Sequence, residues 1–151
     1  MLGSEFPVAF HFSVAIVGTG VPIFDTAFSE VTGLETEMEL ETVTEGGENR
    51  FQHRLPKGIK HQNLVLKRGL TSIASGLLLW CKDTLENDLS DAISTKAMIV
   101  SLQDESGWPS ATWSIDRAYP VKWSVGGFDA MKNELAIETM EFAFSTLKRV
   151  L

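Results

Sequence analysis

The chain has 151 residues, of which 44% are hydrophobic and 22% are charged, a composition typical of one globular domain with its own core. Its formal net charge of −7 argues against non-specific binding to nucleic acids and to anionic membrane surfaces. The single cysteine, Cys81, excludes an intramolecular disulfide, and no apolar run approaches the ~20 residues of a membrane-spanning helix. We expect residues 1–151 to form one domain that folds in a reducing cytoplasm without a signal peptide.

Alternating apolar and polar side chains predict strands along most of the chain. The first predicted strand covers residues 10–17 and ends at Gly18 and Gly20, because glycine breaks strand patterns. The other predicted strands cover residues 35–43, 62–68, 97–102, 112–115, 121–125 and 135–142. The sequence DESGWP at residues 104–109 predicts a turn between two of them.

One helix interrupts the strands. Four apolar residues recur at helical spacing, namely Ile73, Leu77, Cys81 and Leu85. Thr71 or Ser72 is the expected N-cap, and Asn87 with Asp88 is expected to end the helix. One helix among six or seven strands predicts a mainly β fold, a β-sandwich or split barrel with the helix packed on it.

The predicted strand at residues 35–43 carries an acidic face. Glutamates occupy every second position, at Glu35, Glu37, Glu39 and Glu41. Because successive side chains of a strand point to opposite faces, these four carboxylates share one face and Met38 and Leu40 pack on the other. Like charges in this arrangement repel one another, so the acidic face belongs in open water or opposite a polyanion that it repels.

The segment between residues 44 and 61 shows no strand pattern, and unstructured connections of about 18 residues are uncommon in compact domains. Two interpretations remain open: a mobile surface loop, or an arm that docks on another subunit. The residues that would make such contacts are acidic, basic and apolar: Glu45, Glu48, Arg50, Phe51, Arg54, Leu55, Lys57 and Lys60.

Motifs for catalysis or cofactor binding are missing from the sequence. The glycines at positions 18 and 20 lack the rest of a dinucleotide fingerprint, and no serine has a G-x-S-x-G setting. His11, His53 and His61 are too scattered in sequence to predict a metal site. Cys81 lies on the apolar stripe of the predicted helix, which favours a buried thiol over a nucleophile. We therefore predict no enzyme activity, no cofactor and no metal.

Four ordered blocks of the sequence resemble a known family. They are FSEVTGLETEMELETVTEGGEN at residues 28–49, LPKGIKHQNLVLKRG at 55–69, LQDESGWPSATWSIDRAYPVKW at 102–123 and FDAMKNELAIETMEF at 128–142. Together they are similar to the inner tube proteins of contractile phage tails and contractile injection systems. Two departures are Lys57, which stands where the family often has glycine, and the residues after Phe142.

The resemblance implies a structural tail-tube domain. Family members form hexameric rings whose sheets join into one larger barrel, and the rings stack into a hollow tube inside a contractile sheath. The implied partners are the sheath protein, baseplate or hub proteins, tube terminators and a luminal cargo of DNA, tape measure or protein effector. The implied location is the bacterial cytoplasm during assembly, and then a phage tail or an injection particle.

The resemblance leaves alternative machines open, and it suggests which residues line the bore of the tube. The machine could instead be a non-contractile tail tube or a secreted effector-carrying ring, and a free soluble binding module is the remaining class. We expect Glu35, Glu37, Glu39 and Glu41 to line the bore, where they would repel a phosphate backbone. A solvent-exposed outer face is the alternative position for these four carboxylates.

Overall fold

The computed structural model describes residues 10–18, 23–44, 52–70, 75–87, 89–90, 92–127 and 136–151. The elements in chain order are β1 (His11–Val17), β2 (Ile23–Phe28), β3 (Glu30–Thr32), β4 (Glu37–Thr44), β5 (Gln52–Lys60), β6 (Leu64–Gly69), α1 (Gly76–Leu85), β7 (Lys96–Gln103), β8 (Pro109–Gly126), β9 (Ile137–Ala143) and β10 (Thr146–Arg149). The mainly β fold with one helix is therefore confirmed.

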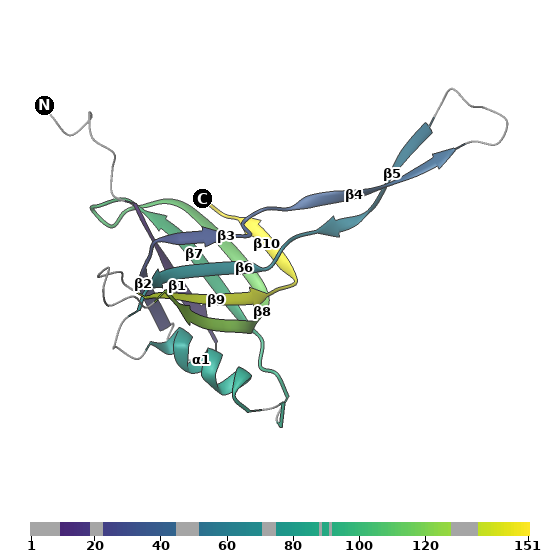
Figure 1. Cartoon of the computed structure of the whole chain (residues 1–151). Helices are drawn as coiled ribbons and strands as arrows, with labels where there is room; N and C mark the ends of the chain where they lie inside the picture. Colours follow the sequence, from purple (N-terminus) through teal and green to yellow (C-terminus); the bar gives the residue numbers. More distant parts are fainter. Residues whose placement is uncertain are drawn as a thin grey trace, which may run out of the picture.

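The strands curl into a barrel in the order β2-β1-β7-β8-β9-β6-β3, with antiparallel pairing throughout (Figure 1). The long strand β8 belongs to both halves of this barrel. Its first half pairs with β7 and β10, and its second half pairs with β9. The partner changes beside Arg117, whose left-handed φ of 55° breaks the regular strand geometry. β3 contacts β1, which brings the two ends of the sheet together.

The core lies between the two halves and is closed at one end by α1 (Figure 1). Leu77 and Cys81 of the predicted apolar stripe are buried, as is the neighbouring Trp80. Leu85 is exposed, and Ile73 lies outside the described residues. The Trp80 ring packs 5.5 Å from the ring of Phe142 on β9, which fixes the helix against the sheet. The predicted N-cap is wrong: Ser75 caps the helix, because its Oγ accepts a hydrogen bond from the Leu78 amide at 3.0 Å.

Several strand predictions need correction. The two predicted strands at residues 112–115 and 121–125 are parts of one strand, β8. Pro120, which was expected to separate them, lies buried within β8. The strands β2, β3 and β10 were not predicted at all. β2 contains a buried aspartate, Asp25, that disrupts the apolar pattern, and β3 and β10 are too short to show one.

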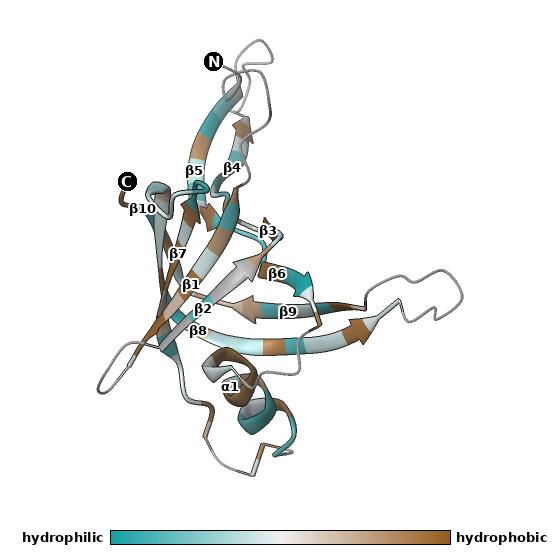
Figure 2. Cartoon of the chain, turned by 90° about the vertical axis from the view of Figure 1, so that its left-hand side faces the viewer, coloured by the Kyte–Doolittle hydropathy of each residue, from teal (hydrophilic) through white to brown (hydrophobic). Residues whose placement is uncertain are grey.

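The predicted long loop is wrong as well. Residues 52–60 form β5, which pairs with β4 along its whole length, and only residues 45–51 between them lie outside the described part of the chain. Together β4 and β5 form a two-stranded arm that projects from the end of the barrel opposite α1 (Figures 1 and 2). At its root, Gly33 takes a φ of 95° and passes so close to the Asn63 carbonyl that a Cβ would clash with it.

Candidate functional site

The arm has two chemically different faces, which follow from its strand register. Glu37 pairs with Lys60, Glu39 with Gly58 and Glu41 with Leu55. The three glutamates occupy alternate positions of β4, so they lie on one face of the arm, as predicted. Their directly paired partners on β5 share that face. Glu35 precedes β4 and lies at the arm's root, beside a hollow of about 310 Å³.

The opposite face of the arm is apolar and exposed. Met38 pairs with Ile59, and Leu40 pairs with Pro56 across a bulge that displaces Lys57. The exposed fractions are 50% for Met38, 49% for Leu40 and 60% for Ile59. The prediction that Met38 and Leu40 pack inside the domain is therefore wrong for the single chain. We call Met38, Leu40, Pro56 and Ile59 the apolar arm face.

The root of the arm is held by ring stacking. The imidazole of His61 stacks on the Phe144 ring at a centroid distance of 3.9 Å, and its Nε2 lies 3.3 Å from the Ser145 carbonyl oxygen. Lys60 and Glu37 form an exposed ion pair at 3.9 Å, a kind that contributes little to stability. The direction of the arm is therefore set by its root rather than by its ion pair.

The predicted contact residues divide into two groups. Arg54, Leu55, Lys57 and Lys60 lie on β5 with exposed side chains. Glu45, Glu48, Arg50 and Phe51 lie outside the described residues. The structure places the first group on one projecting strand, where each side chain is accessible to a neighbouring molecule.

A buried charge cluster inside the barrel was not predicted. Arg68 on β6 contacts two buried carboxylates, Asp25 on β2 at 2.7 Å and Glu138 on β9 at 3.3 Å. Asp25 also accepts a hydrogen bond from the Leu77 amide at 3.1 Å, and Glu138 accepts one from Trp123 Nε1 at 3.0 Å. The cluster therefore ties four strands, β2, β6, β8 and β9, to the beginning of α1. The sequence around Arg68 carries no signal of its burial, because arginine is usually exposed.

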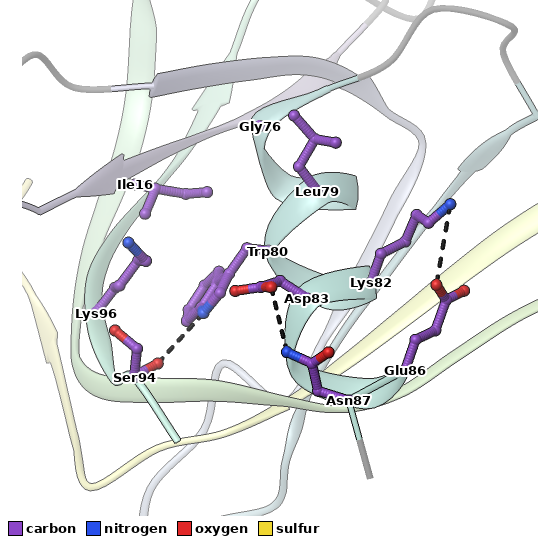
Figure 3. A pocket seen from close by; sticks show the side chains of 10 residues that line it. All are labelled: Ile16, Gly76, Leu79, Trp80, Lys82, Asp83, Glu86, Asn87, Ser94 and Lys96. Atoms are coloured by element: carbon purple, nitrogen blue, oxygen red, sulfur yellow. Dashed lines mark hydrogen bonds and ion pairs between the residues drawn. The ribbon is translucent and has the colours of Figure 1, made fainter. Parts of the chain in front are cut away.

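A groove of about 700 Å³ lies beside α1, between the helix and the ends of β1 and β7 (Figure 3). Ile16, Leu79 and Trp80 supply its apolar wall, and the Trp80 Nε1 donates a hydrogen bond to the Ser94 carbonyl at 3.3 Å. Two cations and two carboxylates also line it, namely Lys82, Lys96, Asp83 and Glu86. Lys96 Nζ lies 5.9 Å from the centre of the Trp80 ring.

Reactive or metal-binding groups do not gather anywhere among the described residues. No cluster of His, Cys, Asp and Glu there has the geometry to hold a metal ion. Burial raises the pKa of the Cys81 thiol to about 12, so this thiol is a poor nucleophile at neutral pH. No helix within the described ranges is long and apolar enough to cross a membrane.

Comparisons with known proteins agree with one another. The model of the family described as T4-like virus tail tube protein gp19 matches residues 8–148. A chain of the anti-feeding prophage baseplate, a 6-fold symmetrised structure, is 29% identical, with 95% of each chain covered and a TM-score of 0.79. No curated protein matches the chain.

Two further solved structures share the fold at lower identity. One is a chain of the sheath–tube complex of the extracellular contractile injection system PVC, at 20% identity, 99% and 95% coverage and a TM-score of 0.72. The other is Hcp1 from Salmonella typhimurium, at 12% identity, 93% and 85% coverage and a TM-score of 0.53. Both likenesses concern the fold alone.

Proposed function

We propose, from the premise that this chain belongs to the T4-like virus tail tube protein gp19 family, that six copies form a ring and that rings stack into the inner tube of a contractile tail or injection system. The observation that carries the proposal is the family match over residues 8–148. The 6-fold symmetry of the related anti-feeding prophage baseplate supports the number of subunits.

The second half of the barrel supplies the strands that would join those of neighbouring subunits in such a ring. It contains four strands, namely the second half of β8, then β9, β6 and β3. Open strand edges invite pairing with another chain, and ring closure removes them. Six such sheets give about 24 strands, which at a spacing of ~4.8 Å and a tilt of ~40° form a barrel of about 50 Å.

The arm supplies contacts between subunits in this proposal. Arg54, Leu55, Lys57 and Lys60 on β5 face a neighbouring copy, and Glu45, Glu48, Arg50 and Phe51 belong to the same contact region. The exposed apolar arm face supports this role, because monomeric proteins rarely expose such surfaces.

The acidic arm face lines or borders the bore. Glu37, Glu39 and Glu41 share that face, and Glu35 lies at the arm's root. Carboxylates there would keep a DNA cargo from adhering, and an effector or tape-measure protein is the other candidate cargo. The double variant Glu37→Lys with Glu39→Lys should form tubes that retain nucleic acid, whereas Glu105→Lys on an exposed turn should not. A cryo-EM map with these glutamates on the outer wall would refute the lining.

The proposed partners are a contractile sheath, baseplate or hub proteins and a tube terminator, and the proposed place of assembly is the bacterial cytoplasm. The related PVC chain comes from a sheath–tube complex, which supports the sheath as partner. We propose no catalytic role, since the family and the similar structures are structural tube proteins. The likeness to Hcp1 keeps a secreted effector-carrying ring as the second candidate.

Negative-stain microscopy of the purified chain, with baseplate components supplied as nuclei, tests the function. We expect rings or tubes about 80 to 100 Å across, from the bore plus a wall of two packed layers. Deleting residues 46–57 should leave a folded monomer that forms no tubes. Tubes of normal length from that deletion would refute the role of the arm, and only monomers from the intact chain would refute the tube.

A further inference from the structure

We propose that His61 is a proton-sensitive latch at the root of the arm. Its protonated ring holds the arm against the connection between β9 and β10, and its neutral ring releases the arm. The latch acts within a single chain and does not require the proposed tube. Three observations carry it: the isolation of the arm, the contacts of the His61 ring and the charges around that ring.

The arm has little support from the barrel. In the described part of the chain, β4 and β5 form a separate two-stranded sheet, and neither has extensive contacts with another element. Both views show the arm pointing away from the barrel (Figures 1 and 2). A hairpin without further packing is held only weakly. The side-chain contacts at its root therefore decide how tightly the direction of the arm is fixed.

Both ring nitrogens of His61 lie against backbone carbonyl oxygens. Nε2 lies 3.3 Å from the Ser145 oxygen, and Nδ1 lies 3.4 Å from the Gln62 oxygen. A carbonyl oxygen only accepts hydrogen bonds, and a neutral imidazole carries one N–H, so either neutral tautomer turns one nitrogen lone pair towards an oxygen. The imidazolium ion donates from both nitrogens. The docked position of the ring therefore favours its protonated form.

The aromatic contact at the root favours the same charge state. The His61 ring lies nearly parallel to the Phe144 ring, at an interplanar angle of 9° and a centroid distance of 3.9 Å. Phe144 is 8% exposed, so it is a fixed part of the barrel core. The face of an aromatic ring attracts a cation. Protonation of His61 therefore strengthens the stack as well as the hydrogen bonds.

The charged groups around the ring are mainly acidic. Four carboxylates and two cations lie at the root of the arm or on the strand segments beside it, namely Glu35, Glu37, Glu141, Asp116, Lys60 and Arg117. Lys60 already pairs with Glu37 at 3.9 Å. An excess of nearby carboxylates favours a positive ring.

The latch closes at low pH and opens as the pH rises. Histidine ordinarily titrates between about pH 5 and 8, whereas carboxylates ordinarily titrate at about pH 4. Because the docked ring is favoured in its protonated form, the contribution of the latch is complete at the low end of the histidine range and is lost through it. An arm of fixed direction loses less conformational freedom on contact with another molecule, so such contacts become pH-dependent.

Distances between two spin labels in one chain test the latch. One label is attached through Thr42→Cys, exposed on β4, and the other through Glu105→Cys, exposed on the turn between β7 and β8. Native Cys81 is fully buried and takes up no label. The labelled chain is mixed with an excess of unlabelled chain, so that pulsed electron paramagnetic resonance measures distances within one chain.

We expect a narrow distance distribution at about pH 5.5 and a broader one at about pH 8, because only the protonated ring holds the arm. Distributions of equal breadth at the two pH values overturn the latch, and this result needs no further variant. The measurement is made on free subunits, so it is independent of tube formation. Absence of tubes in electron micrographs would refute the proposed function and leave the latch standing.

Two matched variants of the labelled chain assign the response to His61. His61→Gln removes the titrating ring and should give one breadth at both pH values. His11→Gln makes the same change on β1, which pairs with neither strand of the arm, and the pH response should persist. A response that survives His61→Gln, or one that is lost with His11→Gln, overturns the assignment.

Discussion

The barrel and the arm of this protein are both antiparallel β-structure, yet they are stabilised in different ways. The barrel buries its apolar side chains and a complete charge cluster, and none of the buried side-chain polar atoms among the described residues lacks a hydrogen-bond partner. The arm leaves Met38, Leu40 and Ile59 about half exposed. An isolated two-stranded hairpin is marginally stable in water. From this comparison we infer that the barrel serves folding, and we propose that the arm serves association.

The largest effect should come from the buried charge cluster. Arg68→Met removes the cation from Asp25 and Glu138 and leaves two buried carboxylates unpaired. We expect a loss of about 5 kcal/mol in the free energy of unfolding, measured by urea denaturation. Lys67→Met is the control, because the Lys67 side chain forms an exposed ion pair with Glu30 at 3.9 Å. Equal stability of the two variants would contradict a structural role of the cluster.

Truncation of Trp80 should have the next largest effect. Trp80 is 6% exposed and packs on Phe142, so Trp80→Ala opens a cavity in the barrel. We expect a loss of about 3 kcal/mol or more, seen as a lower melting temperature. Trp108 is 74% exposed on the turn between β7 and β8, and Trp108→Ala should change stability by less than ~0.5 kcal/mol. Similar melting curves for both variants would show that α1 does not close the barrel as described.

Alkaline pH provides a smaller test of the barrel core. Burial raises the pKa of the Cys81 thiol from its ordinary value of 9.0 to about 12. The folded state therefore favours the neutral thiol, and its contribution is complete below the unfolded pKa and declines as the pH rises from 9.0 towards 12. Cys81→Ala should flatten this decline in stability, as measured by urea denaturation across that range. An identical pH dependence with and without the thiol would contradict its burial.

The smallest effect on folding, and the largest on assembly, is expected in the arm. Leu40→Ser should change the free energy of unfolding of the single chain by less than ~0.5 kcal/mol, because the side chain is already half exposed. The same variant should fail to form tubes in electron micrographs. Leu66→Ser is the matched change in the barrel, where Leu66 is fully buried, and it should destabilise the fold instead. If Leu40→Ser also lowered stability strongly, the division between barrel and arm would be wrong.

Sequence patterns predicted the barrel better than the arm, for a physical reason. Strands such as β6 and β9 bury one face, so burial imposes alternation on their sequences. β5 is exposed on both faces and contains Pro56 and Gly58 beside a bulge, so no burial pattern marks it as a strand. The acidic face of β4 was visible because its glutamates alternate strictly.

The buried cluster and the groove could not be predicted in the same way. Asp25, Arg68 and Glu138 are far apart in sequence and meet only because β2, β6 and β9 converge beside the N-terminus of α1. The groove likewise combines Ile16, Trp80 and Lys96 from three elements. Local patterns carry no information on such distant contacts, whereas the ordered blocks that resemble tail tube proteins did predict the family that the comparison found.

Hydrogen exchange of the free subunit and of assembled tubes tests the central claim most directly. The claim is that the barrel is stable alone and that the arm is stabilised by contacts with other copies. We predict that amides of β4 and β5 exchange rapidly in the free subunit and slowly in tubes, while amides of β7 at the centre of the barrel exchange slowly in both. Equal exchange of the arm amides in the two states would contradict the account.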